Sequence, residues 1–229
     1  MKKSLVFLVA IAMLFVTACS STTNDVATTS VPDNIYNSPE VSWVIYDDAE
    51  SLVDDADRVV IAKLSDISFT VLDSTTGLPP QEQSEAINCH LYTVYLADIL
   101  TNYKGTNVEK LKIVTFGGLK DYRVEEQLAL SSQTEESNTI LILTEMPQLE
   151  IGDVCLFTLL QTEDSDFAHM MPPDQAIYNL TQESPLTQHP NMTAKDIILT
   201  FGEDKWQDFW AQWQAEHPDY QELTTTIYD

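Results

Sequence analysis

The sequence predicts a mainly β fold with flanking helices, in which a small antiparallel barrel precedes C-terminal helices. Five or six strand-like segments follow one another at short intervals between positions 59 and 180, with little helix between them. That arrangement is typical of small antiparallel barrels and sandwiches. After position 193 the apolar residues change to helical spacing. Roughly 185 residues remain once the N-terminal segments are set aside, which is enough for one domain with a core of its own.

The first residues have the layout of an export signal. Lys2 and Lys3 precede an entirely apolar run over 5–16, and the small residue Ala18 follows it. The run is too short to span a membrane comfortably, because a transmembrane helix needs about 20 residues. We therefore expect residues 1–18 to be removed as a signal peptide.

The stretch Val16-Thr17-Ala18-Cys19 closes this run and resembles the lipobox of bacterial lipoproteins. The resemblance implies that the Cys19 thiol receives a diacylglyceryl group and that Cys19 becomes the first mature residue. Two or more acyl chains, such as palmitate, anchor a protein durably, whereas one chain binds marginally. We expect an exported protein, anchored to the bacterial cell membrane by the lipid on Cys19, with its domain on the extracytoplasmic side. The alternative is an uncleaved N-terminal helix with an incidental cysteine.

Residues 19–40 are predicted to form a flexible tether. Ser, Thr, Asn, Asp and Pro dominate this interval, and its scattered apolar residues cannot bury enough surface to offset the entropy of ordering. Residues 41–229 are predicted to form a single β-barrel-like domain with a helical segment over 193–217.

The charge of the chain excludes some partners. Removal of 1–18 takes away two lysines and no acid, which leaves 9 basic and 36 acidic residues and a formal charge of −27. Nucleic-acid affinity comes largely from Lys and Arg, so DNA and RNA are not expected as partners. Anionic lipid headgroups are repelled for the same reason, and membrane contact should depend on the lipid at Cys19. Attraction of cations or of a basic partner is one interpretation of this charge, and a solvated surface is the other.

The first elements of the domain are a helix and three strands. Residues 47–56 predict a short helix, because apolar residues recur there at helical spacing among acidic ones. Strands are predicted over 59–71, 91–103 and 111–116. The second of them is apolar on both faces, as in a curved strand covered on each side. Glycine turns at Gly105 and Gly117-Gly118 follow the second and third strands, and Thr76-Gly77-Leu78-Pro79-Pro80 opens a polar loop after the first.

The middle of the chain alternates between polar and strand-like segments. Residues 119–138 are acidic and predicted to be irregular. Two further strands are predicted over 139–143 and 154–160, and a short one over 176–180.

The C-terminal region predicts two helices. Thr193 and Asp196 form a capping-box pattern at the start of the first helix, and Gly202 closes it. The second helix covers about 204–216. Four large aromatic residues fall on one stripe of it: Trp206, Phe209, Trp210 and Trp213. This stripe either packs against the barrel or forms an aromatic binding face for a sugar, a peptide or the bilayer interface.

The remaining cysteines form an even pair in an exported chain. A disulfide between Cys89 and Cys155 would close a 66-residue loop and stabilise the fold by about 4 kcal/mol on the chain-entropy model. The alternative is two buried thiols, because both residues lie in strand-like apolar runs.

The sequence contains no pattern that specifies catalysis, a metal or a cofactor. It lacks Gly-x-Ser-x-Gly, Ser-x-x-Lys, His-Glu-x-x-His and a Gly-rich phosphate loop. Cys89 and His90 are adjacent, but neighbours on a strand point to opposite faces. We therefore predict no catalytic residues, no metal site and no cofactor.

Three blocks resemble uncharacterised bacterial secreted proteins and lipoproteins. They are Ala56-Asp57 with the strand after it, Tyr92-Thr93-Val94 leading to Lys104-Gly105, and Ile151-Gly152-Asp153 before Leu156-Phe157. The resemblance covers about 50–160 and implies a five-stranded barrel related to the OB fold and to the netrin-like modules of tissue inhibitors of metalloproteinases. Those inhibitors ligate zinc through a free N-terminal cysteine, whereas Cys19 is expected to be acylated.

These observations favour a non-catalytic, membrane-anchored binding or accessory domain of the cell envelope, with an unknown protein partner or ligand. One alternative is a protease-inhibitor-like or immunity-type lipoprotein that uses loops such as 117–138. The other is a hydrolase whose carboxylates come from distant positions, which would have to converge in a cleft.

Overall fold

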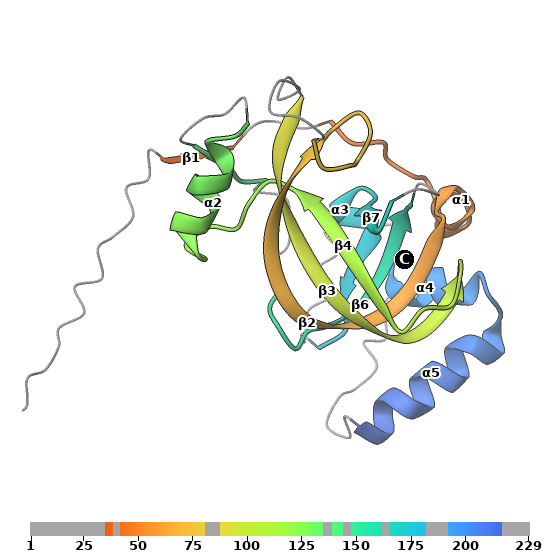
Figure 1. The fold of residues 1–229 in the computed structure, drawn as a ribbon. Helices are drawn as coiled ribbons and strands as arrows, with labels where there is room; N and C mark the ends of the chain where they lie inside the picture. The colour runs from red at the N-terminus through yellow and green to blue at the C-terminus, as the bar shows by residue number, and fades with distance from the viewer. Residues whose placement is uncertain are drawn as a thin grey trace, which may run out of the picture. The chain divides into compact units, whose positions relative to one another are not determined.

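Six strands form the main sheet of the protein, which is described by a computed structural model over residues 35–38, 42–80, 88–134, 139–143, 148–161, 165–181 and 192–216 (Figure 1). The strands are β2 (Arg58–Asp73), β3 (Cys89–Lys104), β4 (Lys110–Phe116), β6 (Val154–Leu160), β7 (Phe167–Met170) and β8 (Ile177–Asn179). Their hydrogen-bonded order is β2-β3-β4-β7-β6-β8, and β2 also pairs with β6. The predicted signal peptide and Cys19 lie outside the described residues.

The pairing of β6 with β2 connects the end of this strand order back to its first strand. The series β2-β3-β4-β7-β6 therefore runs in a ring, with β8 beyond β6. All of these ladders are antiparallel except the parallel β4–β7 pair. The ring is thin around β7, which shares three residue pairs with β4 and two with β6. The predicted mainly β fold with C-terminal helices is confirmed. The predicted barrel has no clear closure, because only the short strand β7 links β4 to β6.

The strand β2 holds this arrangement together, because it pairs along one edge with β3 and along the other with β6. Its residues 58–62 are all buried, which explains why 59–62 are continuously apolar and do not alternate with polar residues. The register of the β2–β3 ladder shifts at three places, the last between Leu64 and Asp66. Such bulges bend a strand, and here they allow β2 to curve around the core.

Short helices cover the main core. The predicted N-terminal helix is α1 (Ala49–Asp55), and its inner residues join the main core cluster. The Oδ1 atom of Asp48 accepts the Ser51 N–H at 2.8 Å, and this hydrogen bond holds the pKa of the Asp48 carboxyl below its usual range. At the other end, Lys104 Nζ from β3 donates to the carbonyl oxygens of Val53 and Asp54 at 2.7 and 3.0 Å. A cation at this position satisfies carbonyls that the last turn leaves unpaired.

The C-terminal helices are α4 (Ala194–Leu199) and α5 (Glu203–Glu216), and both confirm predicted helices. The capping box of α4 forms as predicted, since the Asp196 N–H donates to Thr193 Oγ1 at 3.3 Å and the Thr193 N–H donates to Asp196 Oδ2 at 2.8 Å. None of the described helices is both long and apolar enough to cross a bilayer.

A smaller layer, of which the sequence predicted only a strand over 139–143, packs on β2 and β3 near Phe69 and Leu91 (Figure 1). It contains β1 (Tyr36–Asn37) paired in parallel with β5 (Ile140–Leu141), and the helix α2 (Val124–Ser131). The prediction that 119–138 is irregular is therefore wrong for α2. The predicted tether over 19–40 includes β1, so ordered structure begins before position 41. The predicted strand over 139–143 is reduced to β5, and β7 and the short helix α3 (Pro173–Ala176) were not predicted.

Candidate functional site

The aromatic stripe predicted on α5 is largely packed. Trp206 and Trp213 are 7% and 6% exposed and belong to the main core cluster, while Phe209 and Trp210 are half-buried against it. The rings stack in pairs, Trp206 on Trp210 with centroids 5.5 Å apart and Phe209 on Trp213 with centroids 5.9 Å apart. This burial favours the packing interpretation over an exposed binding face.

The two cysteines are buried and are not joined by a disulfide. Cys89 on β3 pairs with Asp73 of β2, and Cys155 on β6 pairs with Ala62 of β2. The two cysteines therefore lie beside positions of β2 that are eleven residues apart. Of the two alternatives for this pair, a disulfide or two buried thiols, the structure has the buried thiols. Burial raises the pKa of the Cys155 thiol, and the nearby Asp153 carboxylate adds to that effect. A thiol in this environment is a poor nucleophile.

Within the described ranges, no group of three or more His, Cys, Asp or Glu side chains is placed to hold a metal ion. His90 lies against the ring of Phe116, with centroids 5.1 Å apart, while the neighbouring Cys89 is fully buried. The positions His189 and His217 lie outside the described residues.

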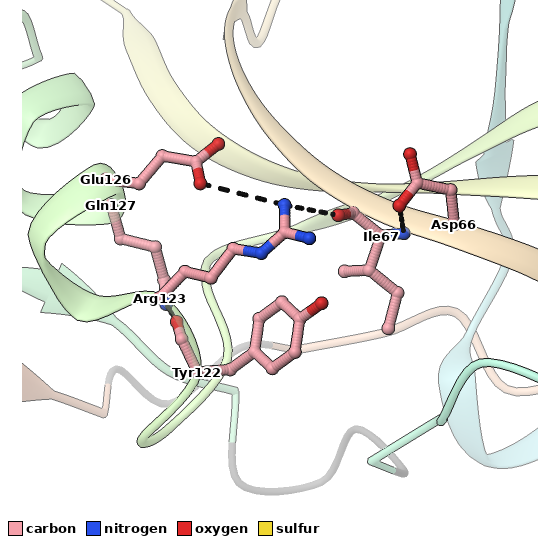
Figure 2. Close-up of polar contacts among 6 residues, drawn as sticks. All are labelled: Asp66, Ile67, Tyr122, Arg123, Glu126 and Gln127. Atoms are coloured by element: carbon pink, nitrogen blue, oxygen red, sulfur yellow. Dashed lines mark hydrogen bonds and ion pairs between the residues drawn. The ribbon is translucent and has the colours of Figure 1, made fainter.

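A polar cluster at the start of α2 serves the fold (Figure 2). Arg123 Nη1 donates to the carbonyl oxygen of Ile67 on β2 at 3.1 Å and lies 3.8 Å from Glu126 Oε2. Its guanidinium also lies over the Tyr122 ring, 5.2 Å from the centroid. Because these contacts connect the start of α2 to the Ile67 carbonyl on β2, we assign this cluster to the attachment of α2 to β2.

The strongest candidate site is a pocket of about 320 Å³ between the β3–β4 hairpin and three residues near the end of β6 and the start of β7, Gln161, Ser165 and Asp166. We call it the basic pocket, because three cations line it: Arg58, Lys110 and Lys112. The chain holds only nine basic residues beyond position 18, so a third of them gather here. The other lining residues are Leu96, Val108, Leu111, Gln161, Ser165 and Asp166.

Arg58 is held rigidly at the start of β2. Only 8% of the residue is exposed, which is unusual for an arginine. Its Nη1 atom donates to the Thr106 carbonyl oxygen at 2.6 Å, and its Nε atom donates to Gln161 Oε1. The side chain runs close under Gly105, where an added Cβ would lie 2.8 Å from Arg58 Cγ. Glycine at this position therefore leaves room for the arginine.

The two lysines come from β4, where alternate residues point to the same face. Lys110 Nζ lies 2.7 Å from Asp98 Oδ1 on β3, and this hydrogen bond holds the pKa of the Asp98 carboxyl below its usual range. Lys112 lies over the ring of Phe167 on β7, 5.4 Å from its centroid, and remains exposed. Lys110 therefore has an acidic partner, whereas Lys112 contacts an aromatic ring.

This arrangement can bind an anionic group. Arg58 offers a planar fork of donors that matches carboxylate or phosphate oxygens, and Lys112 adds a mobile charge. No motif in the sequence predicts this site. A signal was present in the pattern Lys110-x-Lys112 at the start of a predicted strand, but Arg58 and Ser165 join it only through the fold.

No protein-family model matches the chain, and no curated protein matches it in sequence.

Proposed function

We propose that this protein is a lipid-anchored, non-catalytic binding domain of the bacterial cell envelope, and that the basic pocket holds an anionic group of its ligand. The observation that carries the proposal is the gathering of Arg58, Lys110 and Lys112 around one pocket in a chain of formal charge −25. A surface that is otherwise strongly acidic gains nothing in solubility from such a cluster. A ligand-binding role accounts for it.

The strand order supports the resemblance to OB-fold barrels. In chain order around the ring, β2, β3 and β4 are the first three strands, and β6 and β7 are the fourth and fifth. The basic pocket lies against the second and third strands and the connection between the fourth and fifth. OB-fold barrels bind their ligands on this face and with these loops. The charge of the chain disfavours a nucleic acid there, so we propose a smaller anionic ligand.

The anchoring part of the proposal rests on the lipobox-like stretch that ends at Cys19. Cells fed a fatty-acid probe should label the wild-type protein, and the Cys19→Ser variant should carry no label. Unlabelled wild-type protein would contradict the anchor, and so would a Cys19→Ser variant that is labelled as strongly as the wild type.

The binding part is tested by calorimetry on the purified full-length protein in detergent. N-acetyl-L-leucine and inorganic phosphate are the two probes, each titrated separately. We expect at least one to bind, and Lys112→Gln to weaken it about tenfold, as the loss of one charge-assisted hydrogen bond predicts. Lys205→Gln removes an exposed lysine on α5, outside the pocket, and should have no effect. Equal binding by both variants, or no binding of either probe, would contradict the proposal.

A further inference from the structure

We infer that the basic pocket recognises a single carboxylate attached to an apolar group, as in an N-acylated aliphatic amino acid or a peptide that ends in one. This inference rests on the proposed function and names the class of ligand. Three properties of the pocket support it: its net charge, the free donors of Arg58 and its apolar lining.

The charge of the lining suits a monoanion. Among the residues that the structure describes, three cations and one carboxylate, that of Asp166, line the pocket. A second carboxylate, that of Asp98, neutralises Lys110 at 2.7 Å. The described residues at the pocket therefore supply about one net positive charge. A carboxylate balances this charge, whereas a phosphate dianion would leave an uncompensated negative charge beside Asp166.

The donors of Arg58 suit a planar acceptor. A guanidinium carries five N–H groups, and the hydrogen bonds to Thr106 and Gln161 use two of them. Within the described part of the chain, no acidic side chain forms an ion pair with Arg58. The remaining N–H groups lie on a side chain that is already fixed, so a carboxylate that accepts from them loses little entropy on binding.

The rest of the lining suits an aliphatic group. Leu111 also lines the pocket, but it lies between the two lysines on β4 and packs into the main core. The other two apolar residues, Leu96 on β3 and Val108 in the turn after it, line the same pocket as the cations. An aliphatic side chain beside the carboxylate would bury apolar surface against them. The pocket volume of about 320 Å³ is at the lower end of small-ligand pockets, which fits one residue rather than a longer segment.

The experiment compares four probes by calorimetry on the full-length protein: N-acetyl-L-leucine, N-acetyl-L-leucinamide, N-acetylglycine and inorganic phosphate. The leucine carboxylate should bind about tenfold or more tightly than its amide, because the amide lacks the charge that pairs with Arg58. It should also bind about tenfold more tightly than N-acetylglycine, which lacks the aliphatic side chain. Phosphate should bind more weakly than N-acetyl-L-leucine.

Two variants connect these preferences to the pocket. Arg58→Lys keeps the charge but loses the planar fork, so it should weaken the acid more than the amide and reduce the discrimination between them without abolishing it. Since Arg58 also supports the fold, Lys112→Gln serves as a second variant on an exposed side chain and should weaken the acid about tenfold while barely changing the amide. Lys205→Gln is the matched control and should leave all four probes unchanged.

The outcomes separate the two levels of the proposal. Phosphate binding that equals or exceeds that of N-acetyl-L-leucine, and depends on Lys112, would overturn the carboxylate inference and leave an anion-binding pocket. Equal affinity for the leucine and glycine acids would overturn the apolar part. Binding of no anion would overturn the proposed function as well. A further titration with a pentapeptide ending in leucine distinguishes a peptide C-terminus from a free N-acylated amino acid as the ligand. If the pentapeptide binds more tightly than N-acetyl-L-leucine, the ligand is a peptide terminus, and if it binds equally, the ligand is a small acid.

Discussion

Arg58 shows how one residue can serve both the fold and a site. Its bonds to Thr106 and Gln161 join the turn after β3 to the end of β6, and the same bonds fix the guanidinium at the edge of the basic pocket. The sequence shows only that an arginine precedes a strand. Its burial and its neighbours depend on positions 48 and 103 residues further along the chain, so no local pattern predicts them.

The room that Gly105 leaves for Arg58 can be tested with a pair of alanine variants. Gly105 and Gly152 have φ values of +93° and +103°, so alanine is strained at both by about 1 kcal/mol or more. Only at Gly105 would the new Cβ also collide, with Arg58 Cγ at 2.8 Å and the Asp57 carbonyl oxygen at 2.9 Å. We expect Gly105→Ala to be the more destabilised by about 1 to 3 kcal/mol in urea unfolding. Equal losses in the two variants would show that the arginine moves aside freely.

His169 on β7 should make stability depend on pH. It packs against Tyr92 with ring centroids 6.1 Å apart, and burial lowers its pKa from the ordinary value of 6.5. Below about pH 6.5 the unfolded chain therefore takes up a proton that the folded chain does not, and stability falls as the pH falls toward the folded pKa. Urea midpoints measured at about pH 7 and about pH 5.5 should drop more for the wild type than for His169→Gln. Identical drops would place the pH dependence elsewhere.

At the scale of elements, sequence prediction succeeded where an element carries its own signal. The helices α1 and α4 have N-caps at Asp48 and Thr193, and both were predicted. The N-cap residue of α2 is Arg123, which has a left-handed backbone with φ of 43° and forms no side-chain capping bond. The buried residues of α2 are Gln127 and Ser131. Because these buried residues are polar, the sequence of α2 shows no apolar helical face and resembles that of an exposed loop. The strand β7 was missed because its four residues are defined by their partners on β4 and β6.

The attachment of α2 should depend on the fully buried Gln127. Its Oε1 atom accepts the Leu119 N–H at 2.9 Å, and its Nε2 atom donates to the Leu119 carbonyl oxygen at 2.9 Å and to that of Tyr122. The variant Gln127→Ala leaves these backbone groups without partners, so we expect a loss of about 2 kcal/mol in the free energy of unfolding. Gln207→Ala, on the exposed surface of α5, should cost a few tenths of a kcal/mol at most. If the two variants lose the same stability, the hydrogen bonds of Gln127 to Leu119 and Tyr122 do not stabilise the attachment of α2.

At the scale of the whole molecule, the basic pocket is a local exception in an anionic body. The chain carries 36 acidic against 11 basic residues. An approaching anion is repelled by the distant carboxylates and attracted by the cations around the pocket. Both effects are electrostatic, but they act over different distances. Added salt therefore screens the repulsion by the distant carboxylates more than the attraction by the nearby cations.

The rate at which an anion enters the pocket should therefore rise with salt. Charges in contact with the ligand lie well within a Debye length of about 10 Å at 0.1 M salt, so they are screened little, whereas the repulsion from the rest of the surface is screened strongly. We expect the association rate of N-acetyl-L-leucine to increase about twofold or more between about 0.02 M and 0.15 M NaCl, while its dissociation rate changes less. Stopped-flow or NMR exchange measurements on the full-length protein would give both rates. An association rate that falls as salt is added would mean that the anion is drawn in by an extended basic surface, which contradicts a pocket confined to Arg58, Lys110 and Lys112.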